Sequence, residues 1–173
     1  MILHSSSLAR HNQPEPDETA GDVQRSYLDA LQLLERLHRL MLDLVKDEFE
    51  RLGQQDLTPV QGMILFNLGG QQVSAGELRS RGMYQGSNVS YNLKKLVDMG
   101  YVHHERSSLD RRSVRVSLTL RGAEVRDRID ALFSRHAELL SMSGVLDDPP
   151  LQDVNRQWQR IERFWSDQIR YIY

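Results

Sequence analysis

Arginine and lysine side chains provide the clearest candidate chemistry in this sequence, which is the recognition of a polyanion. Asp110, Arg111 and Arg112 form a short charged run between two predicted strands. An arginine guanidinium at an exposed hairpin tip can enter the narrow minor groove of duplex DNA, whose negative potential favours it. The alternative is an ion pair within the loop and no ligand, because exposed pairs are common and contribute little.

A second set of polar side chains lies just before this run. Arg79, Lys94 and Lys95 can neutralise phosphates, and asparagine can pair bidentately with adenine in the major groove. The base-edge candidates are therefore Asn88, Tyr91 and Asn92. The full set of candidate DNA-contact residues is Arg79, Ser87, Asn88, Ser90, Tyr91, Asn92, Lys94, Lys95, Asp110, Arg111 and Arg112.

The charges are distributed unevenly along the chain. The 173 residues carry a net charge of −2. Residues 74–121 contain nine Lys and Arg against four Asp and Glu, which gives +5 for this segment and leaves −7 for the rest. A basic segment in an acidic frame is the electrostatic footprint of a polyanion-binding protein. A solvated charged surface is the alternative, but the clustering of the charges favours the binding interpretation.

The elements that would position these residues are a helix and a β-hairpin. Residues 86–100 have apolar side chains at three- and four-residue steps, which predicts an amphipathic helix that ends at Gly100. Residues 101–106 and 113–118 read as two short strands, joined by a basic loop. A helix that enters the major groove beside a hairpin that reaches the backbone or minor groove fits duplex DNA. The predicted buried face of the helix is Val89, Leu93, Leu96 and Val97.

Capping signals predict the remaining helices. A long helix begins at Val23 and ends at Gly53, and Thr58 opens the next helix with a capping box to Gln61. Ser74 opens a short helix through Arg81, which completes helix-turn-helix spacing. Thr119 caps a further helix, and a linker at 143–150 leads to the last one. The last helix carries a predicted dimer seam at Trp158, Ile161, Trp165 and Ile169.

The order of these elements resembles the MarR family of winged helix-turn-helix regulators. Residues 110–119 are similar to the family's D-x-R-x-x-x-L-x-L-T pattern, and residues 93–102 to its Leu-x-x-Leu-x-x-x-Gly-x-Val spacing. The acidic, proline-containing start and the Trp-rich last helix are similar to a PetP/LdtR-like branch. The resemblance implies that Arg112 enters the minor groove, where Asp110 would hold its guanidinium extended.

The expected fold is mainly α with a small β-hairpin wing, in four parts. These are a polar tail (1–22), a dimerisation helix (23–57), a winged helix-turn-helix domain (58–122) and C-terminal dimerisation helices (123–173). The expected function is a homodimeric transcription regulator on a pseudo-palindromic double-stranded DNA operator, whose half-sites lie about 10 bp apart. The resemblance also implies a small aromatic ligand. Residues that could line its pocket, or be ordinary core, are His38, Met41, Met63 and Phe66.

Several other functions fit the sequence poorly. The chain has no cysteine, which excludes disulfides and thiolate metal sites and fits a cytoplasmic location. The histidines are dispersed, so we expect no metal site and no cofactor. No G-x-S-x-G motif is present, so we do not expect an enzyme. No apolar run reaches the length of a membrane span. The alternative function is a winged-helix module that binds protein and has no DNA-binding role.

Overall fold

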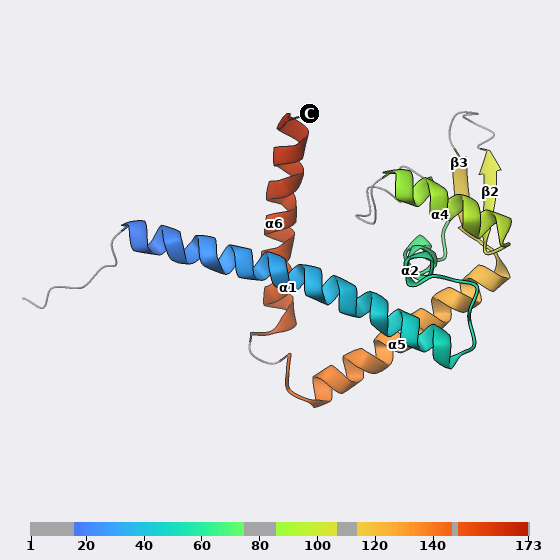
Figure 1. Ribbon diagram of the computed structural model, residues 1–173, viewed down its shortest axis with the longest axis horizontal. Helices are drawn as coiled ribbons and strands as arrows, with labels where there is room; N and C mark the ends of the chain where they lie inside the picture. Colours follow the sequence, from blue (N-terminus) through green and yellow to red (C-terminus); the bar gives the residue numbers. More distant parts are fainter. Residues whose placement is uncertain (1–15, 75–85, 107–113, 147–148, 173) are drawn as a thin grey trace, which may run out of the picture. The chain divides into compact units, whose positions relative to one another are not determined.

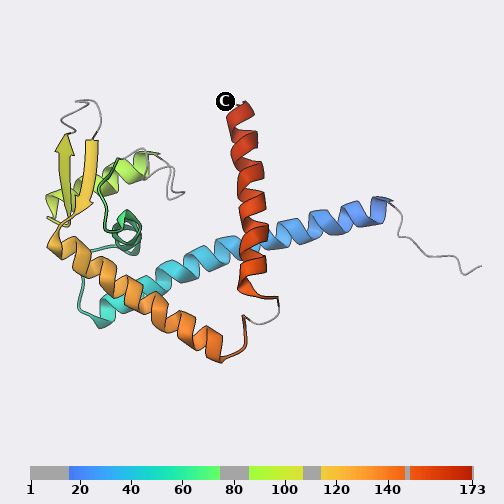
Figure 2. The same ribbon diagram turned by 180° about the vertical axis from the view of Figure 1, so that it is seen from behind.

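A computed structural model describes residues 16–74, 86–106, 114–146 and 149–172, which are mainly helical with one small antiparallel sheet (Figures 1 and 2). The chain divides into two units, residues 1–47 and 48–173. The described elements are α1 (Pro16–Arg51), α2 (Pro59–Leu68), β1 (Val73–Ser74), α4 (Gly86–Asp98), β2 (Val102–Arg106), β3 (Val114–Leu118), α5 (Leu120–Met142) and α6 (Leu151–Ile172).

The first helix begins earlier than its apolar pattern predicts. α1 starts at Pro16 instead of Val23, so the predicted polar tail over 1–22 extends too far into the chain. Proline is favoured in a first helical turn, because its φ is already helical and the missing N–H would have had no partner there. The predicted end is confirmed, since α1 stops at Arg51 and Gly53 has a φ of +68°. Several large apolar side chains of α1 are exposed: Val23, Leu28, Leu33, Leu34, Leu37, Leu40 and Leu44.

The core of the second unit is built around α2. Its N-terminus has the predicted capping box, in which the Thr58 hydroxyl accepts from the Gln61 N–H and the Gln61 side chain accepts from the Thr58 N–H. Most of the helix is apolar, and it packs against both α4 and α5 (Figures 1 and 2). Phe66 of α2 meets Phe133 of α5 edge to face, with 5.3 Å between ring centroids. Because α2 contacts both helices, its packing against α5 also supports α4.

The sheet has three strands, one more than the hairpin predicted from the sequence. The strand order is β1-β3-β2, and both pairings are antiparallel. β2 and β3 pair in the predicted hairpin, with Val102 opposite Leu118 and Glu105 opposite Arg115. β1 adds Val73 opposite Val116. Ser74, which we expected to cap a helix, lies in this strand, and the helix expected after it falls outside the described residues.

An ion cluster around the buried carboxylate of Glu48 connects the last turn of α1 to α5. The Glu48 carboxylate is only 6% exposed, and it accepts two hydrogen bonds from Arg51, at 2.8 and 2.7 Å. It also accepts one from Arg135 of α5, at 2.9 Å. The Arg51 hydrogen bonds outweigh the effect of burial and, with Arg135, lower the pKa of Glu48 to about 2. Glu48 is therefore ionised at neutral pH, and its charge is fully paired.

Candidate nucleic-acid interface

α4 has one buried face and one polar face, as its periodicity predicts. Val89, Leu93 and Leu96 are buried against the rest of the unit. The helix ends at Asp98, and Gly100 follows with a φ of +75°, a conformation that glycine adopts without strain. Its residues exposed to solvent include four of the candidate DNA contacts: Ser90, Tyr91, Lys94 and Lys95. Asn92 is half-buried at the border of this face.

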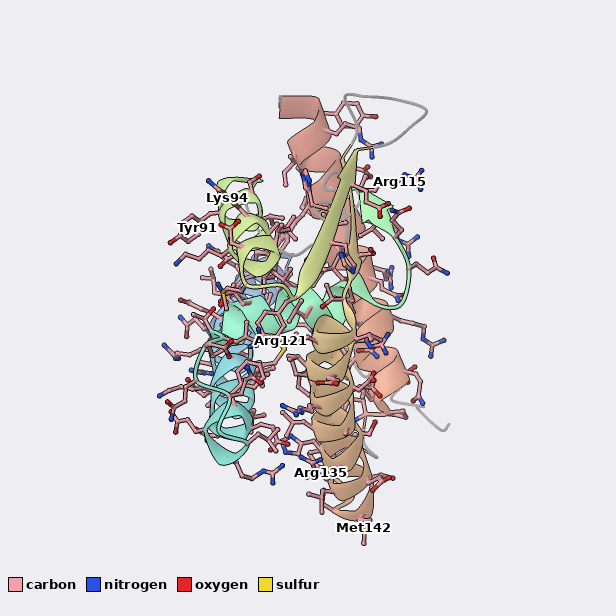
Figure 3. The ribbon with its side chains drawn as sticks, turned by 90° about the vertical axis from the view of Figure 1, so that its right-hand side faces the viewer. Tyr91, Lys94, Arg115, Arg121, Arg135 and Met142 are labelled. Carbon is pink, nitrogen blue, oxygen red and sulfur yellow. The ribbon has the colours of Figure 1, made fainter. Side chains whose placement is uncertain are left out.

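The exposed face of α4 presents cations beside an aromatic ring. Tyr91 is 59% exposed, and the Lys95 ammonium lies 4.7 Å from the centroid of its ring. Figure 3 shows Tyr91 and Lys94 projecting from α4 on the side that faces away from the sheet. The same view shows Arg115 of β3 on the opposite side of the sheet. Arg115 therefore does not join the cationic face of α4, although its charge contributes to the basic segment.

The other candidate contacts lie in the first turn of α4 or outside the described residues. Ser87 and Asn88 belong to the first turn of α4. Arg79 and the run from Asp110 to Arg112 fall outside the described residues. The described parts of β2 and β3 end on either side of that run, so it connects two paired antiparallel strands, with Arg106 opposite Val114 in the last pair.

The orientation of α4 depends on a joint formed by the residues that follow it. The Tyr101 hydroxyl donates to the Asp56 carboxylate and accepts from the Gln54 amide, each at 2.8 Å. The Tyr101 carbonyl accepts from the Thr119 N–H at 3.1 Å. The Thr119 hydroxyl donates to the Gly100 carbonyl at 2.8 Å and accepts from the Gly122 N–H at 3.1 Å. One buried tyrosine thus connects the α1–α2 loop, the end of α4 and the start of α5.

Arg121 closes this joint from the solvent side. Its guanidinium lies 2.8 Å from the Asp56 carboxylate, donates to the Met99 carbonyl at 3.1 Å and lies 4.2 Å from the centre of the Tyr101 ring. Burial works against ionisation of Asp56, but the hydrogen bonds from Tyr101 and Gln54 outweigh it and lower the pKa of Asp56. Burial and the contact with Asp56 raise the pKa of Tyr101. At neutral pH, Asp56 is therefore a charged acceptor and Tyr101 a protonated donor in the hydrogen bond between them.

Sequence reasoning missed this joint. It counted Arg121 with the basic segment, whereas the side chain is committed to Asp56. Asp56 lies two residues before the predicted helix cap at Thr58, and Tyr101 directly follows the helix-ending Gly100. Asp56 and Tyr101 each lie close to a helix boundary that the sequence predicts. No local pattern connects two residues that are 45 positions apart.

The residues proposed for a ligand pocket divide between the two units. His38 and Met41 belong to α1, where His38 is exposed and Met41 half-buried. Met63 is buried in α2, and Phe66 is half-buried against Phe133. The pocket stays a prediction.

The predicted dimer seam lies along α6. Trp158, Ile161 and Trp165 are half-buried, and Ile169 is 62% exposed. Phe164 and Tyr171 are exposed on the same helix. α6 thus offers apolar side chains to solvent, while the seam itself stays a prediction.

The described residues also bear on metal and membrane sites. Within them, no three His, Asp or Glu side chains are grouped in a way that could hold a metal ion. None of the helices seen in the described ranges combines the length and apolarity needed to cross a membrane.

Comparison with known proteins assigns the chain to a family. A model of the MarR family matches residues 55–113, from the α1–α2 loop to the end of the hairpin connection. The exopolysaccharide II synthesis transcriptional activator ExpG of Rhizobium meliloti (strain 1021) is 32% identical over 158 residues. That alignment covers 91% of this chain and 81% of ExpG. The chain belongs to the MarR family. MarR proteins are transcription regulators and not enzymes.

Solved MarR structures share the fold at lower sequence identity. A MarR transcriptional regulator from Methanosarcina mazei Go1 is 23% identical, with a TM-score of 0.62 over 79% of this chain and 95% of that one. A mutant of MarR from E. coli, solved in complex with operator DNA, is 17% identical, with a TM-score of 0.58 over 79% and 95% of the two chains. These comparisons show the MarR fold for this chain.

Replacing Gly122 by alanine tests how tightly the joint of this MarR-family chain is packed. A Cβ at Gly122 would overlap the carbonyl oxygen of Tyr101, and backbone cannot move aside as a flexible side chain can. We expect Gly122→Ala to lower the free energy of unfolding in urea by about 1–3 kcal/mol. Gly21→Ala is the control, because a Cβ there meets nothing within 4 Å. The control should raise stability by about 0.5–1 kcal/mol. Equal stability gains in both variants would contradict the close approach.

Proposed function

We propose that the chain is a homodimeric, sequence-specific transcription regulator that binds double-stranded DNA through α4 and the β2–β3 wing. The observation that carries the proposal is the polar, cationic face of α4, held by the Tyr101 joint on a MarR fold. The E. coli MarR mutant with the same fold was solved on operator DNA. ExpG, at 32% identity, is named as a transcriptional activator. Both findings support a DNA-binding role. We propose that the protein acts in the cytoplasm.

The proposed contacts follow from the chemistry of each group. Lys94 would neutralise a phosphate, and Asn88 and Asn92 would pair with base edges in the major groove. Arg112 would enter the minor groove, with Arg111 against the backbone. Ser87, Ser90 and Arg79 would add backbone contacts from the same region. Because α4 has no arginine, shape readout by the wing is expected to carry part of the specificity.

Assembly follows from the exposed apolar residues of α1 and α6. We propose that residues 23–57 and 123–173 join two copies, and that residues 58–122 of each copy bind one half-site of a pseudo-palindromic operator. Half-sites about 10 bp apart would place the two copies of α4 in successive major grooves. A PetP/LdtR-like branch within the family stays a prediction.

The wing arginines provide the first test of DNA binding. Operator sequences would be selected by the purified protein from random duplexes, and affinity measured across a range of salt concentrations. Arg112→Ala should weaken operator binding about tenfold or more, as loss of a specific contact does. Arg111→Ala should act more weakly and lower the salt slope by about 1, as loss of one phosphate contact does. Arg160→Ala, which removes an exposed charge from α6, is the control.

Two outcomes would count against this assignment. Unchanged affinity in both wing variants would remove the wing from the mechanism. The absence of any salt-dependent duplex binding by the wild-type protein would favour the alternative, a winged-helix module that binds protein.

The dimer seam has its own test. Ile169→Asp introduces a charge into the proposed seam of both copies at once, and an unpaired charge is costly to bury. We expect the variant to dissociate or to melt at a lower temperature, as measured by light scattering and thermal unfolding. Gln159→Asp adds the same charge almost three helical turns earlier on α6 and about 80° away around the helix axis, and it should leave the dimer intact. A stable dimer with native melting in Ile169→Asp would exclude α6 as the seam.

We also propose that a small ligand controls operator binding. We expect a small aromatic effector to be recognised by side chains of the His38, Met41, Met63 and Phe66 set, because polarizable and polar atoms suit aromatic ligands. A tenfold loss of operator affinity needs a coupling of only about 1.4 kcal/mol. Phenolic and other aromatic acids should raise the melting temperature and release operator, and Met63→Trp should abolish both effects. A broad aromatic set with neither effect would end this part of the proposal.

A further inference from the structure

The exposed face of α4 contains one group whose chemistry differs from its neighbours. Tyr91 exposes 59% of its surface among the side chains of Ser90, Lys94 and Lys95, which are polar or charged. A single exposed aromatic residue on a protein surface is ordinary and needs no explanation. On a helix face that enters the major groove, however, the same ring would be pressed against base edges. The contribution of the Tyr91 ring to binding depends on which apolar groups the bases expose in the major groove.

The Tyr91 ring has a neighbour that limits its motion. The Lys95 ammonium lies over the ring, 4.7 Å from the centroid, one helical turn further along α4. A cation at this distance is attracted to the electron-rich face of the ring. The contact restricts the ring to fewer orientations before DNA arrives, which reduces the cost of ordering it on binding. Lys95 therefore has a role that Lys94, one residue earlier and without a ring contact in the described structure, does not share.

Thymine is the base that offers an apolar group to such a ring. In the major groove, adenine, guanine and cytosine present hydrogen-bond donors and acceptors, whereas thymine also presents its C5-methyl group. Given the DNA-binding function proposed above, on which this inference rests, we propose that Tyr91 is a specificity-determining residue that reads a thymine methyl group. Lys95 is its positioning residue, which holds the ring over the methyl group.

The size of the effect follows from the area that one methyl group buries. Transfer of a methyl group from water to an apolar contact corresponds to an affinity change of about fourfold. Uracil pairs with adenine as thymine does and lacks only this methyl group. A thymine-to-uracil exchange in the operator therefore removes the proposed contact and leaves the hydrogen-bonding pattern of the base pair unchanged.

The experiment combines protein variants with uracil-substituted operator. The full-length protein selects its operator from random duplexes, and each thymine of one half-site is then exchanged for uracil in turn. We expect one position at which uracil weakens binding of the wild type about fourfold. Tyr91→Ala should bind the thymine and uracil duplexes at that position with equal affinity. Tyr91→Phe, which keeps the ring and loses the hydroxyl, should retain the fourfold difference.

The two lysines separate positioning from simple charge. Lys95→Gln should reduce the thymine–uracil difference, and Lys95→Arg should preserve it, because a guanidinium also stacks on an aromatic face. Lys94→Gln, the matched control, should weaken binding of both duplexes by the same factor, as loss of one phosphate contact would. A Lys95→Gln protein with the full difference would overturn the positioning role.

The outcomes also distinguish this inference from the function on which it rests. If the wild type selects no duplex, the proposed function fails. If the wild type binds a selected operator but Tyr91→Ala keeps every uracil penalty of the wild type, the function stands and the reading of thymine by Tyr91 is wrong. Tyr91 is exposed on α4, so its replacement leaves the core intact, and thermal unfolding of each variant checks this directly.

Discussion

The hydrogen bonds of Tyr101 are the constraint on which the rest of the candidate interface depends. The side chain is fully buried, yet its hydroxyl reaches Asp56 and Gln54 in the loop after α1, while its carbonyl accepts from Thr119 at the start of α5. A buried hydroxyl without these partners would cost more than the bonds contribute. These hydrogen bonds therefore fix the α1–α2 loop, the segment after α4 and the start of α5 relative to one another. α4 ends at Asp98, three residues before Tyr101, so these hydrogen bonds also fix the position of its C-terminal end.

Much of this fold could be predicted from local patterns, because local physics determines them. The spacing of Val89, Leu93 and Leu96 predicted the buried face of α4, and the Thr58 and Gln61 pair predicted the start of α2. Both depend on residues within one or two turns of each other. The structure supplied what depends on distant partners, namely the joint at Tyr101 and the addition of β1 to β3. A strand of two residues has no alternation for a pattern to detect.

The sequence predicted which residue types form the candidate site better than it predicted where their side chains lie. Counting charges identified the basic segment, but a count gives every arginine equal weight. In the structure Arg121 is bound to Asp56, and Arg115 lies on the far side of the sheet from Tyr91 and Lys94 (Figure 3). Fewer cations of the basic segment are therefore available to a polyanion than the count implied, and each lysine of α4 matters more. Sequence could not separate these roles, because they depend on which side of the fold each side chain occupies.

The short third strand has a consequence for the solubility of the protein. In the order β1-β3-β2, the central strand β3 pairs along its length with β2 and over two residues with β1, which leaves less of its backbone as a template for another chain. One outer edge is only two residues long, and the other, in β2, carries His103, His104 and Glu105, which are exposed. Brief edges and polar or charged side chains discourage strand-to-strand association. In the proposed dimer, the two wings on neighbouring half-sites would therefore resist pairing into a shared sheet.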